Sequence, residues 1–365
     1  MSVKKEHVLK ALSSVIDPDL GQDLVSLGMI KELEISEKKI SFSVVLTTPA
    51  CPLREMLKKD CLQAIESLGL INVEIDITMT SSVTSTRMEN LPILPNVKNL
   101  IAIASGKGGV GKSTVTSNMA VALAKSGATV GIIDADIFGP SIPTMFGCED
   151  SQPTVKRIED KNWIIPIDRY GVKLISIGFL SPGENAIVWR GPMASSALKQ
   201  FISDTDWGEL DYLLFDLPPG TSDIHLTLVQ TIPVTGAVVV TTPQKVALAD
   251  AIKGVSMFRQ PQINVPVLGI IENMAYFTPE ELPNNKYYIF GKDGGKQFAE
   301  KNNLPFLGEI PIVQSIRESG DIGEPVVMKD EITAEAFMKL AQNLAQQVAI
   351  RNATKEKTKV VEINQ

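Results

Sequence analysis

The sequence predicts a doubly wound α/β fold with a mostly parallel sheet, preceded by a small α/β (α+β) domain. From residue 100 onward, short apolar runs alternate with helical segments, and several runs are continuously apolar. Strands covered on both faces of a parallel sheet have this character. The 365 residues also exceed the roughly 100–200 residues of one domain. We expect a small domain at 1–87, a linker at 88–99, the larger domain at 100–351 and a polar tail at 352–365.

Apolar periodicity places the individual elements. The small domain is expected to contain helices at 4–16 and 52–67, with strands at 30–35, 40–47 and 73–79. Expected strands of the larger domain are 100–104, 129–134, 172–177, 211–216, 237–241, 265–271 and 306–310. Its expected helices are 112–126, 194–203, 245–259, 294–302 and 333–350.

Composition excludes several classes of protein. A net charge of −7 argues against non-specific binding of nucleic acid, and we expect no nucleic-acid partner. No apolar run approaches the ~18–20 residues of a membrane span, and the N-terminus lacks a signal-peptide pattern. Three cysteines, Cys51, Cys61 and Cys148, are too few and too scattered for a disulfide framework. We therefore expect a cytoplasmic protein with reduced thiols and no membrane partner.

A phosphate-binding loop lies between the first strand and first helix of the larger domain. The pattern G-x-x-x-x-G-K-S covers Gly106, Lys107, Gly108, Gly109, Val110, Gly111, Lys112 and Ser113, with Thr114 next. Glycines let backbone amides surround phosphate oxygens at a helix N-terminus. We expect Lys112 to reach the β/γ-phosphates of ATP and the Ser113 hydroxyl to bind Mg²⁺.

The same glycines also match a dinucleotide pattern. Gly106, Gly108 and Gly111 satisfy G-x-G-x-x-G. A dinucleotide site gains nothing from Lys112 and Ser113 directly after the third glycine, whereas Mg-phosphate chemistry does. The sequence therefore favours ATP.

Carboxylates follow two of the expected strands. Asp134 and Asp136 end one strand, and Asp216 ends another. We expect Asp136 to orient the attacking water, Asp134 to hold the Mg²⁺ shell and Asp216 to hold a Mg²⁺-bound water. Each acid alone is equally a helix cap or a solvated turn residue, but three in this order favour a hydrolytic site. Asn273, after the strand at 265–271, is expected either at the nucleotide base or in a turn.

A second lysine in the loop, Lys107, gives the pattern K-G-G-V-G-K-S-T. The pattern resembles the deviant Walker A class, which includes the MinD and ParA ATPases and the nitrogenase iron protein. The resemblance implies an ATP-bound homodimer in which Lys107 contacts nucleotide phosphates across the interface. It also implies that Lys107, with Lys112, Asp136 and Asp216, takes part in catalysis.

Five further segments resemble the Mrp/ApbC iron–sulfur carrier ATPases: residues 134–141, 189–193, 216–221, 272–277 and 289–291. This resemblance implies an ATPase that accepts iron–sulfur clusters from a scaffold and transfers them to recipient apoproteins. The N-terminal segments 17–19, 24–30 and 47–52 are similar to the small domain of SufT-type assembly factors.

Cys51 lies in the last of those segments, before an expected helix N-terminus. A thiolate is stabilised there, which makes Cys51 the candidate iron–sulfur ligand. The alternative is a small buried residue.

The chain departs from the carrier family at one place. Where the family usually has Cys-Pro-x-Cys, this sequence has Thr278-Pro279-Glu280-Glu281. Two such cysteine pairs from a dimer would supply the four thiolates of one cluster. Two readings stay open: a carrier with a different ligand set, or an ATP-driven regulatory or positioning ATPase that holds no cluster.

Overall fold

The computed structural model describes residues 4–70, 72–87, 93–158, 160–180, 191–279, 281–282, 284–329, 332–357 and 359–361. The chain divides into two compact units. One contains residues 1–84 and 349–355, and the other contains residues 85–348 and 356–365. Residues 88–92 of the expected linker lie outside the described residues, as do Trp189, Arg190 and Glu280.

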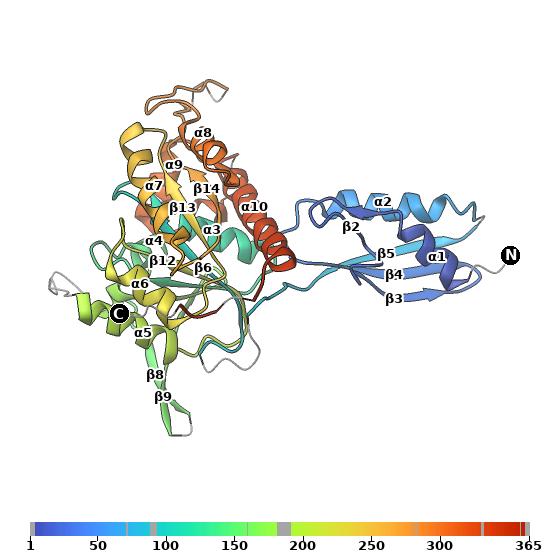
Figure 1. Ribbon diagram of the computed structural model, residues 1–365, viewed down its shortest axis with the longest axis horizontal. Coiled ribbons are helices and arrows are strands. Elements are labelled where there is room, and N and C mark those ends of the chain that lie inside the picture. Colours follow the sequence, from blue (N-terminus) through green and yellow to red (C-terminus); the bar gives the residue numbers. More distant parts are fainter. Residues whose placement is uncertain are drawn as a thin grey trace. The chain divides into compact units, whose positions relative to one another are not determined.

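The N-terminal unit is a three-stranded sheet with two helices on one face (Figure 1). The sheet order is β3-β4-β5, with β3 and β4 antiparallel and β4 and β5 parallel. The elements are α1 (Lys5–Leu12), β1 (Ile16–Asp17), β2 (Gln22–Asp23), β3 (Ile30–Ile35), β4 (Lys39–Leu46), α2 (Arg54–Glu66) and β5 (Glu74–Ser81). Alternate residues of β4, from Ile40 to Leu46, are buried, which forms the core beneath the helices. The first helix ends earlier than expected because residues 16–17 pair with β2.

The larger unit is built on an eight-stranded sheet in the order β10-β11-β7-β12-β6-β13-β14-β15. Only β10 is antiparallel to its neighbour. Its strands are β6 (Val97–Ser105), β7 (Val130–Asp134), β10 (Ile167–Arg169), β11 (Val172–Ser176), β12 (Leu210–Asp216), β13 (Gly236–Thr241), β14 (Val267–Glu272) and β15 (Phe306–Glu309). Every residue of β7 and β13 is buried, as the continuous apolar runs predicted.

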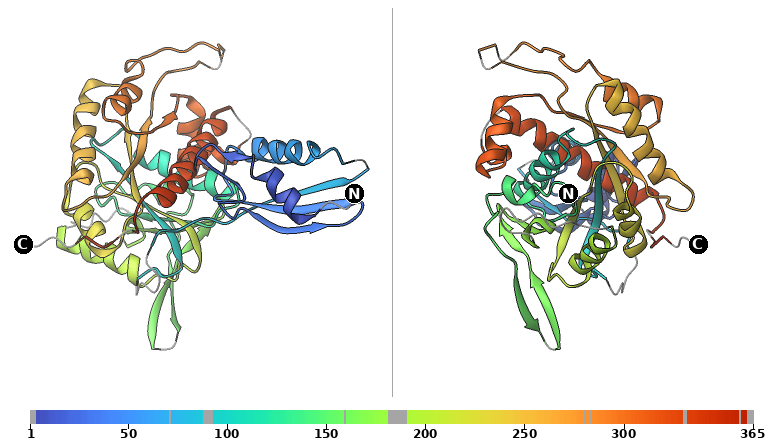
Figure 2. Two further views of the ribbon diagram at one scale, coloured as in Figure 1. Left: turned by 45° about the vertical axis from the view of Figure 1, so that its right-hand side comes forward. Right: turned by 90° about the vertical axis from the view of Figure 1, so that its left-hand side faces the viewer.

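Helices cover both faces of this sheet. They are α3 (Lys112–Lys125), α4 (Ile142–Met145), α5 (Gly191–Ser203), α6 (Asp223–Thr231), α7 (Lys245–Arg259), α8 (Gly294–Lys301), α9 (Gln314–Ile322) and α10 (Ile332–Thr354). Figure 2 shows α3 and α10 on one face and α7 on the other. The doubly wound fold predicted from the sequence is confirmed.

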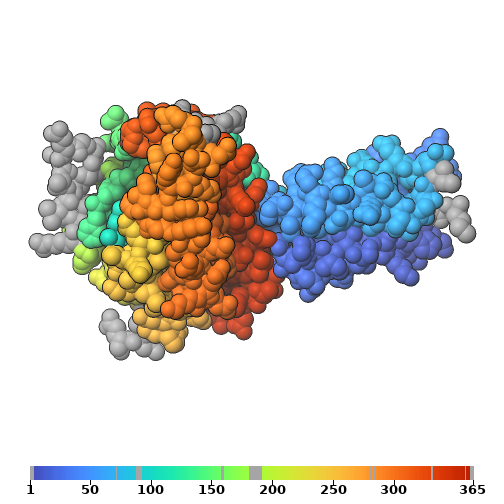
Figure 3. All heavy atoms as spheres, turned by 90° about the horizontal axis from the view of Figure 1, so that it is seen from above, coloured from blue at the N-terminus to red at the C-terminus, as the bar shows by residue number. Residues whose placement is uncertain are grey.

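The long helix α10 contacts the edge strand β15. The Asn343 side-chain amide donates a hydrogen bond to the Leu307 carbonyl of β15 (2.7 Å). Figure 3 shows α10, in red, beside the orange segment that contains α8.

Several features differ from the expectations. Strand β6 begins at Val97, three residues before the expected start, and α10 continues beyond residue 350. Val361, expected in a frayed polar tail, packs against the core, and its amide donates to the Val229 carbonyl (3.0 Å). The hairpin of β8 (Thr154–Ile158) and β9 (Lys161–Ile165) was not expected, and it projects from the unit (Figure 2). Among the described residues, no helix has the length and apolarity that a bilayer span requires.

Candidate functional site

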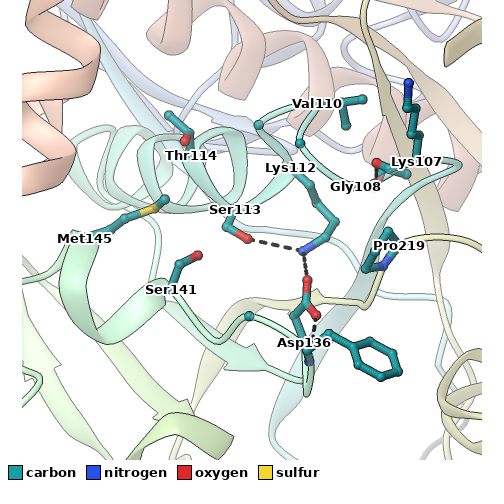
Figure 4. Close-up of a pocket in the computed structure, with 15 residues that line it drawn as sticks. Lys107, Gly108, Val110, Lys112, Ser113, Thr114, Asp136, Ser141, Met145 and Pro219 are labelled. Atoms are coloured by element: carbon teal, nitrogen blue, oxygen red, sulfur yellow. Dashed lines mark hydrogen bonds and ion pairs between the residues drawn. The ribbon is translucent and has the colours of Figure 1, made fainter. Parts of the chain in front are cut away.

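The phosphate loop connects β6 to α3 at the carboxyl edge of the parallel strands. Gly109 and Gly111 have φ values of +81°, which favour glycine. The loop lines a cavity of about 340 Å³ that is also bounded by Asp136, Phe138 and Pro219 (Figure 4). The first backbone amides of α3 lie at this loop, as a phosphate site requires.

Two of the glycines are also required by what packs behind the loop. A Cβ on Gly106 would overlap the backbone at Asp250, in α7. A Cβ on Gly111 would overlap the Asn273 side-chain amide. The backbone of α7 and the side chain of Asn273, which follows β14, therefore pack directly against the loop.

Lys112 is the cation at the centre of the site. It is 6% exposed, and its Nζ lies 2.7 Å from Asp216 Oδ2 and 3.4 Å from Asp136 Oδ2. Burial lowers the pKa of Lys112, but attraction to Asp216 and Asp136 outweighs it, and the net shift is upward. Lys112 therefore carries its charge in the cavity (Figure 4).

Asp216 is completely buried at the end of β12. Its Oδ2 accepts hydrogen bonds from Lys112 Nζ (2.7 Å) and Ser113 Oγ (2.5 Å). Its Oδ1 accepts from Thr116 Oγ1 (2.6 Å). Sequence reasoning missed Thr116, although it lies four residues after Lys112 on the same face of α3.

Asp134 is buried, and both of its carboxyl oxygens accept hydrogen bonds from neighbouring protein groups. Its Oδ1 accepts from the Asp136 amide (3.2 Å), and its Oδ2 accepts from the Ile142 amide (3.3 Å) and Ser176 Oγ (2.8 Å). Burial, with repulsion from Asp216, raises the pKa of Asp134 to about 7. Both carboxyl oxygens accept hydrogen bonds from within the protein, and the expected role of Asp134 in the Mg²⁺ shell stays a prediction.

Asp136 and Lys107 both line the cavity but lie differently. Asp136 faces Lys112, and burial raises the pKa of its carboxyl group. Lys107 is exposed, and Figure 4 shows its side chain extending away from Lys112. Lys107 is therefore free of the carboxylates that surround Lys112 and open to solvent.

Asn273 braces the loop. Its side-chain amide donates to the Val110 carbonyl (2.8 Å), and it is 6% exposed. Its backbone amide donates to the Thr241 carbonyl at the end of β13. Asn273 therefore packs behind the phosphate loop, and its expected contact with the nucleotide base stays a prediction.

The loop after Asp216 leads into α6. Its Gly220 amide donates to the Ser105 carbonyl (2.8 Å), and Ser222 and His225 form a reciprocal cap on α6. His225 is buried, its Nε2 has no hydrogen-bond partner, and burial lowers its pKa to about 4. Sequence reasoning assigned His225 no role, because an isolated histidine carries no spacing signal.

Burial raises the pKa of all three cysteine thiols. Helix α2 begins at Arg54, so Cys51 lies before the helix rather than at its first turn. Burial raises the pKa of Cys51, and the carboxylates of Asp17 and Asp19 add to the rise, while the Leu53 amide opposes it. Burial therefore opposes the thiolate expected at Cys51, and the role of Cys51 as an iron–sulfur ligand stays a prediction. Cys61 and Cys148 are fully buried, which raises their pKa values to about 12 and about 11.

The segment that replaces the family's cysteine pair follows a short two-stranded contact. Phe277 and Tyr287 exchange backbone hydrogen bonds of 2.8 and 2.9 Å, and Thr278 is next along the chain. Glu281 is exposed. Within the described residues, no group of three or more His, Cys, Asp or Glu side chains is arranged to hold a metal ion.

Comparisons with known proteins match both units. A family model described as the NUBPL iron-transfer P-loop NTPase matches residues 96–348, and one described as an iron–sulfur cluster assembly protein matches residues 5–77. The iron-sulfur cluster carrier protein of Synechocystis is 45% identical over 94% of this chain and 98% of its own length. The protein of the same name from Escherichia coli is 43% identical over 93% of this chain and 91% of its own length.

A solved structure agrees with these matches. The nucleotide-binding protein of Archaeoglobus fulgidus, in complex with ADP, has a TM-score of 0.56 and 39% identity, covering 66% of this chain and 93% of that one. The resemblance stated from the motifs is confirmed. The chain belongs to the NUBPL iron-transfer P-loop NTPase family and carries an iron–sulfur cluster assembly domain before the NTPase domain.

Proposed function

We propose that this protein binds and hydrolyses ATP as a homodimer and carries iron–sulfur clusters from a scaffold to recipient apoproteins. One observation supports ATP hydrolysis: Lys112 and Ser113, which line the cavity, both contact Asp216 at the end of β12. Membership of the iron-transfer NTPase family supports the proposal that the protein carries iron–sulfur clusters. The three free cysteines suit a reducing compartment such as the cytoplasm.

Each residue of the site has a distinct part in hydrolysis. Lys112 exchanges its carboxylate partners for the β/γ-phosphates, whose charge it neutralises. Asp136 faces the cavity and orients the attacking water. Lys107, exposed and unpaired with Lys112's carboxylates, supplies a second cation to the phosphates of the partner protomer.

The Ser113 hydroxyl and the Asp216 carboxylate fit Mg²⁺, because both are hard oxygen donors and they contact each other at 2.5 Å. Mg²⁺ bound there would neutralise charge on the phosphate oxygens. Typical Mg²⁺ sites use one or two protein oxygens with waters and phosphates, so two donors suffice.

This chain lacks the cysteine pair with which the family usually binds an iron–sulfur cluster, so the cluster must have other ligands. Cys51 is the most accessible of the three thiols, being half-buried where Cys61 and Cys148 are buried. A dimer presents Cys51 twice, and small thiols or a partner protein complete the four ligands of a cluster. Such a cluster is labile, which suits a carrier.

A second candidate function rests on Thr278 and Glu281, which stand where the family has thiolates. In that case the protein is an ATP-driven regulatory or positioning module without a cluster. Iron binding separates the two functions.

The test is anaerobic reconstitution with iron and sulfide, followed by iron and sulfide quantitation and the visible charge-transfer spectrum. We expect a substoichiometric cluster in the wild type, most of it lost in Cys51→Ser and retained in Cys61→Ser and Cys148→Ser. ATP hydrolysis, measured in each variant, controls for folding. If Cys51→Ser keeps the wild-type cluster, the ligand assignment is wrong. If the wild type takes up no iron, the regulatory function replaces the carrier function.

A further inference from the structure

Thr116 is a buried hydroxyl that lies outside the phosphate-loop motif. It occupies α3 one turn after Lys112 and is completely buried. Its Oγ1 lies 2.6 Å from Asp216 Oδ1 and 3.0 Å from the Lys112 carbonyl. A threonine in a helix commonly bonds only to the carbonyl four residues earlier, so the shorter contact with a carboxylate needs its own explanation.

The hydroxyl has a single proton to donate. A hydrogen bond to a charged carboxylate is shorter and stronger than one to a neutral carbonyl, and O–H···O⁻ contacts of about 2.5–2.7 Å are typical. The 2.6 Å contact therefore identifies Asp216 Oδ1 as the acceptor.

Asp216 has three side-chain donors, and they fall into two kinds. Lys112 and Ser113 donate to Oδ2, the oxygen nearer the phosphate loop. In the proposed function, Lys112 moves to the phosphates of ATP and Ser113 binds Mg²⁺. Thr116 donates to the opposite oxygen, Oδ1, and is not among the residues that line the cavity. It is the donor that stays with Asp216 while Lys112 and Ser113 change partners.

We propose that Thr116 is a positioning residue: its hydrogen bond to Asp216 Oδ1 keeps Oδ2 directed at Ser113 and the phosphate loop, where the Mg²⁺ of bound ATP is held. The inference rests on the nucleotide site of the proposed function. Residues that hydrogen-bond to metal-binding carboxylates fix their orientation, and their loss typically costs about 10–100-fold in metal affinity. Without Thr116, Asp216 would rotate or take up other partners once Lys112 leaves it.

The test compares Thr116→Val, which keeps the shape of the side chain and removes the hydroxyl, with Thr116→Ser, which keeps the hydroxyl. The readouts are the Mg²⁺ concentration that gives half-maximal tightening of a fluorescent ATP analogue, kcat and KM for ATP at saturating Mg²⁺, and the unfolding temperature. We expect Thr116→Val to raise the Mg²⁺ requirement by about tenfold, with nucleotide binding in EDTA unchanged. Thr116→Ser should stay within about twofold of the wild type.

Thr227→Val is the matched control, because Thr227 is a buried helical threonine bonded to Ser195 Oγ (2.9 Å), away from the phosphate loop. It should leave the Mg²⁺ requirement unchanged. If Thr116→Val unfolds early, Thr116→Ala provides the same comparison with Thr116→Ser at lower side-chain volume. The proposal is overturned if the variants without the hydroxyl need no more Mg²⁺ than the wild type, or if Thr116→Ser behaves like them. A wild type that binds Mg-ATP without hydrolysing it would remove the ATPase function and leave this test intact.

Discussion

Replacing Lys112 should destabilise the protein even without nucleotide. Lys112→Met keeps much of the side chain's length and apolar stem but removes the charge between Asp216 and Asp136. Asp216 then stays fully buried without a cation. Removing one partner of a buried ion pair costs about 3–5 kcal/mol, because the other charge is left unpaired. The same change removes the cation that the phosphates need, so ATP hydrolysis should also be lost.

The stability change is measurable by thermal unfolding in EDTA without nucleotide. A domain of 150–250 residues shifts by roughly 2–4 °C per kcal/mol, so a loss of about 3 kcal/mol corresponds to a Tm lower by roughly 6–12 °C. Adding Asp216→Asn to Lys112→Met should recover part of this loss, because the second change removes the unpaired charge. The buried ion pair does not stabilise this site if Lys112→Met has the same Tm as the wild type. The same conclusion follows if adding Asp216→Asn does not raise the Tm of Lys112→Met.

Three further predictions concern the loop, the buried histidine and the second lysine. Gly111→Ala should weaken ATP binding at least tenfold, since its φ is +81° and its Cβ would displace Asn273; a titration with a fluorescent ATP analogue showing wild-type affinity would contradict this. Because burial lowers the pKa of His225 from the ordinary 6.5 to about 4, the contribution of His225 to the free energy of unfolding should fall by about 3 kcal/mol as pH drops from 6.5 to 4. His225→Gln keeps a capping side chain and should remove that fall in urea unfolding, and an unchanged fall would refute the assignment. Lys107→Ala should impair hydrolysis more than binding, and mixing it with Asp136→Ala should restore activity if Lys107 acts across a dimer; no recovery in verified heterodimers would show action within one chain.

The fold was predictable because local pattern and tertiary environment agree over most of it. Strands such as β7 and β13 are buried on both faces, so their apolar runs are unbroken. The phosphate loop was predictable for a similar reason, since its glycines, lysine and serine are adjacent in the chain. The β8–β9 hairpin was missed because residues 154–157 are all exposed and show no alternation.

The features that sequence reasoning missed depend on contacts between distant segments. Thr116 meets Asp216 across 100 residues of chain, and no local spacing encodes that contact. Asn273 reaches Val110 from 163 residues away. At Cys51 a helix start favours a thiolate, whereas burial of the side chain raises its pKa, and only the first of these two effects can be read from the sequence.

The central claim is that this chain carries an iron–sulfur cluster and delivers it under the control of ATP. The most direct measurement is transfer from the anaerobically reconstituted protein to an apo-ferredoxin, followed by the acceptor's recovered electron-transfer activity, with and without Mg-ATP. The account predicts that the wild type activates the acceptor, that Mg-ATP changes the transfer rate, and that Lys112→Met transfers at a rate Mg-ATP does not change. An acceptor that stays inactive beside a fully ATP-hydrolysing wild type would contradict the claim.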